Sequence, residues 1–247
     1  MPASLSDDEF SRTLCWIREV VPSTDPIAIV GTNKQITVPL EEAYDIAVRL
    51  YQYEPRKMPK IISILCGILH KEPSHADARV MLGLIAHRFR KHAEAVELLK
   101  EALRYNNVDA AYFYNLGNAY FAMGEYEEAL ASLERAVDLD EALFEAYDVM
   151  GKIYRERKDY EKALSYFERS FAIHGQAVWT KAYIAECLFR SGKISEALTN
   201  IEACIDKFLY IRANELASGE MIWPWCARLY SSRKAKFMLD RYKATNC

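Results

Sequence analysis

The sequence lacks the short motifs that would point to catalysis or to a bound cofactor. It contains no glycine-rich phosphate-binding loop, no GxSxG turn and no HExxH metal motif. Its six cysteines are scattered and form no CxxC pair, which is typical of buried, reduced thiols and not of a disulfide framework. His87 and His92 have neither a cysteine nor a paired histidine at ligand spacing. We therefore expect a protein that is not an enzyme and holds no metal ion or cofactor.

Long apolar runs and an excess of positive charge are also missing. The longest apolar run, residues 61–69 (IISILCGIL), is about half of the roughly 20 residues that a membrane-spanning helix needs. The first ten residues, MPASLSDDEF, are acidic and do not have the layout of a signal peptide. A net charge of −3 gives no general reason to expect nucleic-acid binding. These absences predict a soluble, cytoplasmic protein that binds neither membrane nor nucleic acid.

What the sequence does contain is an internal repeat. Gly83, Gly117 and Gly151 are spaced by 34 residues, and one more step reaches Ala185. Three further columns keep this period: Ala95, Ala129, Ala163 and Ala197; Leu99, Leu133, Phe167 and Ile201; and Ala102, Ala136, Ser170 and Cys204. Small residues therefore recur where two helices must approach closely, and large apolar residues recur beside them.

This pattern strongly resembles that of the tetratricopeptide repeat family. The resemblance implies an all-α, right-handed α-α superhelix of about five helical hairpins, because each hairpin can bury its apolar face only against its neighbours. The expected hairpins span a divergent first copy at about 42–75 and then 76–109, 110–143, 144–177 and 178–211, within a repeat domain of residues 41–211. In the divergent copy, Arg49 replaces the small residue and Ile61 replaces the alanine, so we expect different packing there.

Two glycines in the stretch FYNLGNAYFAMGEYEEAL (residues 113–130) have separate roles in this interpretation. Gly117 removes a side chain where the partner helix must come close. Gly124 opens the turn between two helices, where a left-handed backbone costs little only for glycine. Gly192 repeats that turn, whereas Arg90 and Lys158 occupy the same position in other repeats, so glycine is helpful there but not required.

The two ends are expected to differ from the repeats. Residues 1–40 are predicted to form an N-terminal helix, which opens with a capping box at Ser6–Glu9, and a connecting loop or short extended segment. Residues 212–247 are expected to form capping helices, which a solenoid needs over its last stacking face. Trp223 and Trp225 in this tail could instead bind a partner or a second copy of the chain, and the sequence leaves these alternatives open.

The resemblance also implies a binding surface. In this family the first helix of each repeat lines a concave groove, which accepts an extended segment of a partner protein. The corresponding residues here are Val80, Met81, Leu84, His87, Tyr114, Asn115, Asn118, Phe121, Val149, Lys152, Trp179, Tyr183 and Glu186. Members that grip the C-terminus of heat-shock chaperones do so with a clamp of lysine, asparagine and arginine. Only Asn118 matches that clamp, so we expect it to be absent.

Two stretches are similar to a narrower group, the SycD/LcrH-like class II chaperones of bacterial type III secretion. They are residues 36–52 (ITVPLEEAYDIAVRLYQ) and 182–198 (AYIAECLFRSGKISEAL). This resemblance implies a cytoplasmic chaperone that holds an apolar segment of a translocator or export substrate in its groove. Those chaperones have about three repeats, whereas this chain has roughly five. The alternative is a general adaptor that assembles folded proteins through its convex face or its C-terminal tail.

Overall fold

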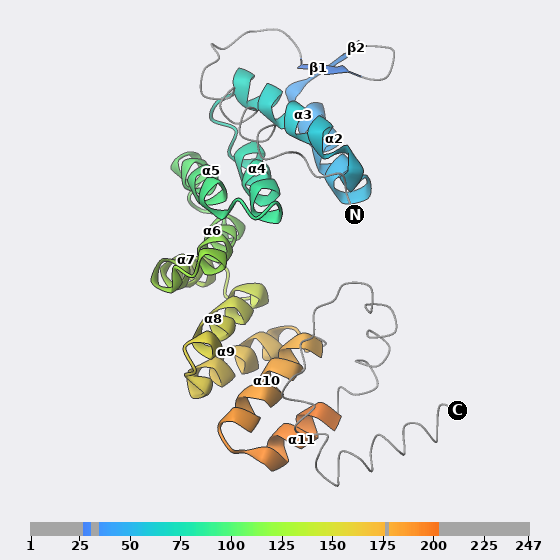
Figure 1. Cartoon of the computed structure of the whole chain (residues 1–247). Helices are drawn as coiled ribbons and strands as arrows, with labels where there is room; N and C mark the ends of the chain where they lie inside the picture. The colour runs from blue at the N-terminus through green and yellow to red at the C-terminus, as the bar shows by residue number, and fades with distance from the viewer. Residues whose placement is uncertain (1–26, 31–34, 176–177, 203–247) are drawn as a thin grey trace, which may run out of the picture. The chain divides into compact units, whose positions relative to one another are not determined.

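The computed structural model describes residues 27–30, 35–175 and 178–202 (Figure 1). A short antiparallel hairpin of β1 (Ile27–Val30) and β2 (Gln35–Val38) precedes a series of helices, with Ile27 opposite Val38. The helices are α2 (Leu40–Tyr53), α3 (Met58–Lys71), α4 (Ala76–Arg88), α5 (His92–Tyr105), α6 (Ala110–Met123), α7 (Tyr126–Leu139), α8 (Phe144–Glu156), α9 (Tyr160–Ile173), α10 (Val178–Arg190) and α11 (Ile194–Glu202). A 3-10 turn, Pro55–Lys57, joins α2 to α3. The prediction of an all-α repeat fold is confirmed, and the hairpin before α2 is an addition to it.

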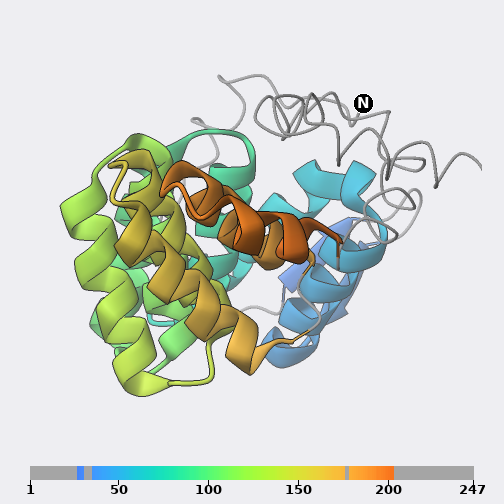
Figure 2. The ribbon, with the colours of Figure 1, turned by 90° about the horizontal axis from the view of Figure 1, so that it is seen from below.

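The helices form successive hairpins, and consecutive helices pack against each other from α4 to α7 and from α9 to α11. The helices α4, α6, α8 and α10 begin at Ala76, Ala110, Phe144 and Val178, at intervals of 34 residues. Figures 1 and 2 show α4 beside α5 and α6 beside α7, and these helices are in contact. The helices α5, α7 and α9 each turn an apolar stripe inward, with alanine, leucine or phenylalanine buried at the repeating positions.

The mid-helix glycines lie at the closest helix contacts, as predicted. A Cβ atom on Gly117 would lie 2.7 Å from Leu133 Cγ and 3.1 Å from the carbonyl oxygen of Ala129. The equivalent atom on Gly83 would lie 3.0 Å from Leu99 Cγ. The 2.7 Å contact at Gly117 is shorter than real Cβ atoms show, so Leu133 can lie this close only because Gly117 has no side chain. The 3.0 Å contact at Gly83 is tight, and a Cβ there would require Leu99 to shift by a few tenths of an ångström.

The turn inside each hairpin repeats one backbone arrangement. Gly124 and Gly192 have φ of +80° and +82°, and Arg90 and Lys158 adopt φ of +63° and +61° at the equivalent positions. In all four turns the next amide N–H donates to a carbonyl five residues earlier, as from Glu125 to Tyr120 at 3.0 Å. The prediction that other residues can replace glycine here is confirmed, since Arg90 and Lys158 take the left-handed conformation themselves.

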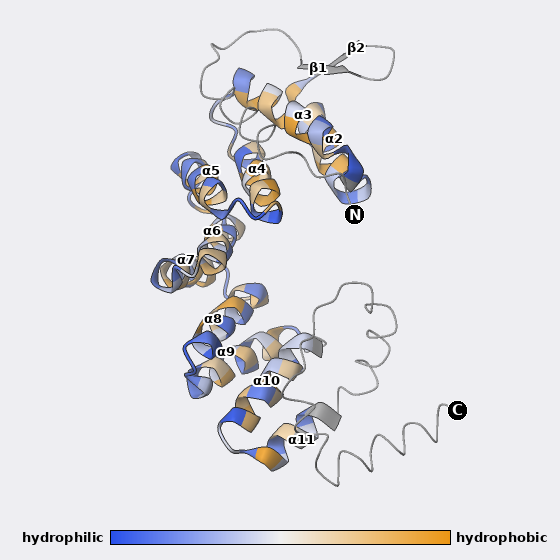
Figure 3. Cartoon of the chain, in the orientation of Figure 1, coloured by the Kyte–Doolittle hydropathy of each residue, from blue (hydrophilic) through white to orange (hydrophobic). Residues whose placement is uncertain are grey.

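The divergent first hairpin buries alanines at a different register. Ala43 and Ala47 of α2 are fully buried, whereas Arg49, which replaces the small residue of the repeat column, is exposed. Ile61 of α3 is fully buried in the place of an alanine. Figure 3 shows hydrophobic colour over much of α3, and eight of its residues are buried, including Ile64 and Ile68. The apolar run at 61–69 is therefore a core helix that packs against α2 and α4.

A buried arginine fastens α4 to its surroundings. The Arg79 side chain is only 9% exposed, and its Nε donates to Glu101 Oε2 of α5 at 3.2 Å. Its Nη1 donates to the carbonyl oxygen of Pro73 in the turn before α4, and its guanidinium lies 4.9 Å from the Tyr105 ring centre. These contacts satisfy a charge that would otherwise be costly to bury.

The chain divides into two compact units, with the boundary inside α8 between Ile153 and Tyr154. The second unit has its own core, in which Ala163 and Phe167 of α9 meet Ile184, Cys187 and Leu188 of α10. The predicted N-terminal helix and the predicted capping helices at 212–247, with Trp223 and Trp225, lie outside the described residues.

Candidate functional site

In the first unit, the predicted groove residues of α6 form a strip of partly exposed side chains, which we call the α6 strip. It consists of Tyr114, Asn115, Asn118 and Phe121. Tyr114, Asn118 and Phe121 are spaced by four and three residues, so they lie along one side of the helix. The Phe121 ring also contacts Tyr126 of α7, with 6.1 Å between the ring centres. The α6 strip therefore offers two aromatic rings and two amides to a ligand.

The helices on either side of α6 contribute fewer of the predicted residues. Leu84 and His87 of α4 are partly exposed, and α4 contacts α6. Val80 and Met81 of α4 are 7% and 8% exposed, and Val149 of α8 is 4% exposed. The last three pack in the core, so their burial removes them from the candidate surface. The physical reason is that a helix inside a solenoid is covered on several sides by its neighbours.

The Tyr114 hydroxyl lies in an acidic neighbourhood. Burial raises the pKa of this hydroxyl, and the carboxylates of Glu145 and Asp148 on α8 raise it further. Lys152, the predicted groove residue one turn after Asp148, is partly exposed. The surface next to the α6 strip is thus aromatic and carries the carboxylates of Glu145 and Asp148 together with the ammonium of Lys152.

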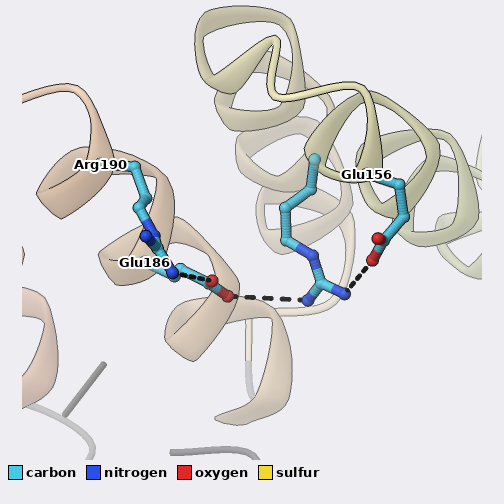
Figure 4. Close-up of polar contacts among 4 residues, drawn as sticks. Glu156, Glu186 and Arg190 are labelled. Atoms are coloured by element: carbon cyan, nitrogen blue, oxygen red, sulfur yellow. Dashed lines mark hydrogen bonds and ion pairs between the residues drawn. The ribbon is translucent and has the colours of Figure 1, made fainter. Parts of the chain in front are cut away.

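In the second unit, the predicted residue Glu186 belongs to a network of charges (Figure 4). Arg155 Nη1 lies 3.6 Å from Glu186 Oε2, and Arg155 Nη2 donates to Glu156 Oε1 at 2.8 Å. Arg190 Nη2 lies 3.9 Å from Glu186 Oε1. Burial raises the pKa of Glu186, while Arg155 and Arg190 lower it in part. The Glu186 carboxylate therefore lies between two cations, which stabilise its charge, while its burial disfavours that charge.

Tyr183 connects this network to the core. The Tyr183 ring, on α10, stacks on the Phe167 ring with 5.0 Å between the ring centres. The Arg155 guanidinium lies 4.9 Å from the centre of the Tyr183 ring. Trp179, one turn earlier on α10, is partly exposed. Trp179, Tyr183 and Glu186 are spaced by four and three residues, so they lie along one side of α10.

Glu186 is the only member of this network among the predicted groove residues. The structure adds Arg155 and Glu156 to it, and also Arg190. The signal for Arg190 was available, because Glu186 and Arg190 are four residues apart on one helix and such pairs face each other. The bond between Arg155 and Glu186 joins helices from successive repeats. The repeat period indicates which side of each helix these residues occupy, but it does not indicate that Arg155 and Glu186 lie opposite each other.

The two histidines near the turn after α4 are paired, which corrects the sequence interpretation. His87 Nδ1 and His92 Nδ1 lie 3.2 Å apart, with 4.8 Å between the ring centres. The pairing arises because the turn between α4 and α5 brings the last turn of one helix against the first residue of the next. Within the described residues there is no cluster of three or more His, Cys, Asp or Glu side chains that could hold a metal ion.

This pair predicts a loss of stability in mild acid. Burial lowers the pKa of both rings, helped at His87 by His92 and at His92 by Arg90. Below about pH 6.5 the unfolded chain therefore binds more protons than the folded chain, and the free energy of unfolding must fall as pH falls. Urea unfolding between pH 7.5 and 5.5 measures this decline. His92→Gln should make the decline shallower, and an unchanged decline would assign it to other groups.

None of the helices in the described part of the chain combines the length and the apolarity that a bilayer crossing needs. The thiols of Cys66 and Cys187 are buried, and burial raises the pKa of each to about 12. Thiols of this kind are poor nucleophiles.

Comparison with protein families supports the interpretation of the repeats. Residues 108–176 match the family described as tetratricopeptide repeat. This part of the chain is similar to tetratricopeptide repeats. Residues 62–136 of this repeat protein also match the family described as anaphase-promoting complex, cyclosome, subunit 3.

Two curated relatives are plant proteins. The chain is 29% identical over 97 residues to the Hsp70-Hsp90 organizing protein of Triticum aestivum. The aligned part is 39% of this chain and 17% of the relative. It is 24% identical over 151 residues to Hsp70-Hsp90 organizing protein 3 of Arabidopsis thaliana, which covers 61% of this chain and 22% of the relative. The chain spans about a fifth of the length of these relatives.

Solved structures share the fold. A MamA protein aligns with a TM-score of 0.59 and 20% identity over 75% of this chain and 98% of its own. PilF of Pseudomonas aeruginosa aligns with a TM-score of 0.62 and 22% identity over 68% of this chain and 77% of its own. At these identities the likeness concerns the tetratricopeptide fold alone.

Proposed function

We propose that this chain is a non-enzymatic protein-binding module that holds an extended segment of a partner protein against the first helices of its repeats. The observation that carries the proposal is the α6 strip, where Tyr114, Asn118 and Phe121 are only partly covered along one side of a helix. Large aromatic side chains that are left partly exposed in this way are typical of binding surfaces.

The chemistry of the strip indicates the kind of segment it would hold. The amides of Asn115 and Asn118 can bond to the backbone of an extended peptide, which has unpaired N–H and C=O groups. The rings of Tyr114 and Phe121 can pack on apolar side chains of that peptide. Glu145 and Asp148, near the Tyr114 hydroxyl, favour a lysine or arginine beside those apolar anchors.

We expect Tyr114→Ala combined with Tyr183→Ala to weaken binding of the partner by at least about tenfold, because truncating a central aromatic anchor commonly costs about 2 kcal/mol or more. The measurement is affinity purification from the native host, quantified by mass spectrometry and then repeated with the purified partner. Tyr53→Ala, which removes a tyrosine that is 79% exposed on α2, is the matched control. Undiminished binding by the double variant, with helicity intact, would falsify the proposal.

A narrower form of the proposal is the one that the sequence resemblance implies. In that form the chain is a cytoplasmic chaperone of type III secretion, and the bound segment belongs to a translocator or another export substrate. The similar stretches at 36–52 and 182–198 are its support. The relatives reported above do not include such a chaperone. Secretion genes next to the gene of this chain would favour this form.

The second candidate is an adaptor that assembles a multiprotein complex through its convex face or its tail. It is favoured by the match of residues 62–136 to a subunit of the anaphase-promoting complex and by the likeness to Hsp70-Hsp90 organizing proteins. Deletion of residues 212–247 should then abolish the complex, while the α6 strip variants leave it intact. A homodimer is a further possible assembly for this candidate, and size-exclusion chromatography with light scattering tests it.

Direct binding of heat-shock chaperone tails is not part of either candidate. The groove positions that would carry the carboxylate clamp hold Tyr114, Asn118, Val149, Trp179 and Tyr183. Val149 is buried, and Tyr183 packs between Phe167 and Arg155. The likeness to the organizing proteins is therefore better explained by a shared scaffold than by a shared ligand.

A further inference from the structure

The turn between α4 and α5 holds two histidine rings beside each other. His87 lies in the last turn of α4, and His92 is the first residue of α5. The Lys91 amide N–H donates to the carbonyl oxygen of Ala86 at 3.0 Å, and Arg90 adopts a left-handed backbone with φ of +63°. The backbone thus sets the positions of both histidines in advance, so a ligand that binds to both rings loses little affinity to ordering them.

The separation of the two rings matches that of two ligands on one metal ion. Zn²⁺ binds imidazole nitrogens at roughly 2.0–2.1 Å in tetrahedral geometry, so two such nitrogens lie about 3.3 Å apart. The Nδ1 atoms of His87 and His92 lie 3.2 Å apart. The ring centres are only 4.8 Å apart and the ring planes are inclined by 60°, so the rings do not point straight at each other. An ion that lies beside the line between the two nitrogens requires such an inclination.

The protonation state of the pair also suits a metal ion. Burial lowers the pKa of both rings, helped at His87 by His92 and at His92 by Arg90. The neutral imidazole, which is the form that binds metals, is therefore favoured near neutral pH. A ring that binds an ion through Nδ1 carries its hydrogen on Nε2, so two neutral rings can bind without releasing a proton.

The donor atoms and the nearby charges indicate which metals this pair would bind. Ca²⁺ and Mg²⁺ prefer oxygen ligands, whereas imidazole nitrogens suit Zn²⁺, Ni²⁺ and Cu²⁺. Arg90 and Lys91 precede His92 in the sequence, and the Lys91 ammonium lies 3.9 Å from the Glu94 carboxylate. These neighbours supply no excess of negative charge, so the attraction for an ion depends on the two nitrogen donors. Both rings are partly exposed, so water can reach an ion between them.

We propose that His87 and His92 bind one divalent transition-metal ion, such as Zn²⁺, through their Nδ1 atoms, with water at the remaining coordination positions. The ion would connect α4 to α5 across the turn of one hairpin. This departs from the expectation, drawn from the sequence, that the chain holds no metal ion. The inference goes beyond the proposed protein-binding function and does not depend on the α6 strip.

Titration of the untagged full chain with zinc chloride at pH 7.5 tests the proposal, with nuclear magnetic resonance of the histidine ring nitrogens as the measurement. This readout reports each ring separately, so zinc that binds to cysteine thiolates does not interfere with it. We expect the Nδ1 signals of His87 and His92 to shift together and to reach saturation at the same zinc concentration. The signals of His174, an exposed histidine in the second unit, should not shift in step with them. Magnesium chloride should shift none of these signals.

Three variants complete the experiment. His92→Gln should raise the zinc concentration that half-saturates His87 at least about tenfold, because even changes behind a metal ligand commonly cost 10–100-fold in affinity. His87→Gln gives the converse measurement on His92, and His174→Gln is the matched control, which should leave the midpoint unchanged.

Three results would overturn the proposal. The first is the absence of any shift at about 1 mM zinc, a concentration at which even a millimolar site is half filled. The second is a shift of Nε2 in place of Nδ1, because the Nδ1 atoms are the ones that face each other. The third is an equal midpoint with and without His92, which would mean that His87 binds an adventitious ion only.

Discussion

Phe167→Ala should lower the free energy of unfolding of the second unit by about 3–5 kcal/mol, the range for truncating a fully buried aromatic ring. Phe167 is 0% exposed and packs among Ile184, Cys187 and Leu188 from the next repeat. Its removal would leave a cavity at the contact between hairpins. The measurement is urea unfolding followed by far-ultraviolet circular dichroism.

The same substitution should also disturb the partly exposed residues above Phe167. The Phe167 ring stacks on Tyr183, and the Arg155 guanidinium packs over the Tyr183 ring. Ile173→Ala, on the exposed side of the same helix, is the control and should change stability by less than about 1 kcal/mol. If Phe167→Ala lowers the free energy of unfolding as little as this control does, Phe167 does not hold the two hairpins together.

Most of the scaffold could be predicted because the repeat determines it. The period of 34 residues reports which side chains must be small and which must be large at each helix contact. The positions of Gly117 and Leu133 follow from it, and the structure places Leu133 against the site where Gly117 lacks a side chain. The turns at Arg90 and Gly124 follow in the same way, since one backbone arrangement recurs in each hairpin.

The candidate site was less predictable. The position of a residue within the repeat indicates which side of its helix it occupies, but not how far neighbouring helices bury it. Val80 and Val149 have the phase of groove residues, yet neighbouring helices bury them. Two contacts between helices could not be predicted for a related reason. The pairing of His87 with His92 depends on the shape of a turn, and that of Arg155 with Glu186 on the register between two hairpins. A repeat period in the sequence indicates neither the shape of a turn nor the register between two hairpins.

Gly117→Val should lower the free energy of unfolding by about 3 kcal/mol, at the upper end of the usual cost of overpacking a core. A single Cβ at this position would already lie 2.7 Å from Leu133 Cγ, and valine adds two methyl groups to it. Leu133 is fully buried and cannot move aside without disturbing α7. Helix propensity opposes this cost only weakly, because replacing glycine in a helix gains less than about 1 kcal/mol.

Two comparisons isolate the close approach of the helices as the cause. Ala122→Val, at an exposed position of the same helix, should cost no more than about 0.7 kcal/mol, the propensity difference alone. Gly83→Ala should be milder than Gly117→Ala, since its Cβ would lie 3.0 Å from Leu99 Cγ instead of 2.7 Å from Leu133 Cγ. Urea unfolding of all four variants orders them. If Gly117→Val and Ala122→Val cost the same, helix propensity and not helix contact would explain the glycine column.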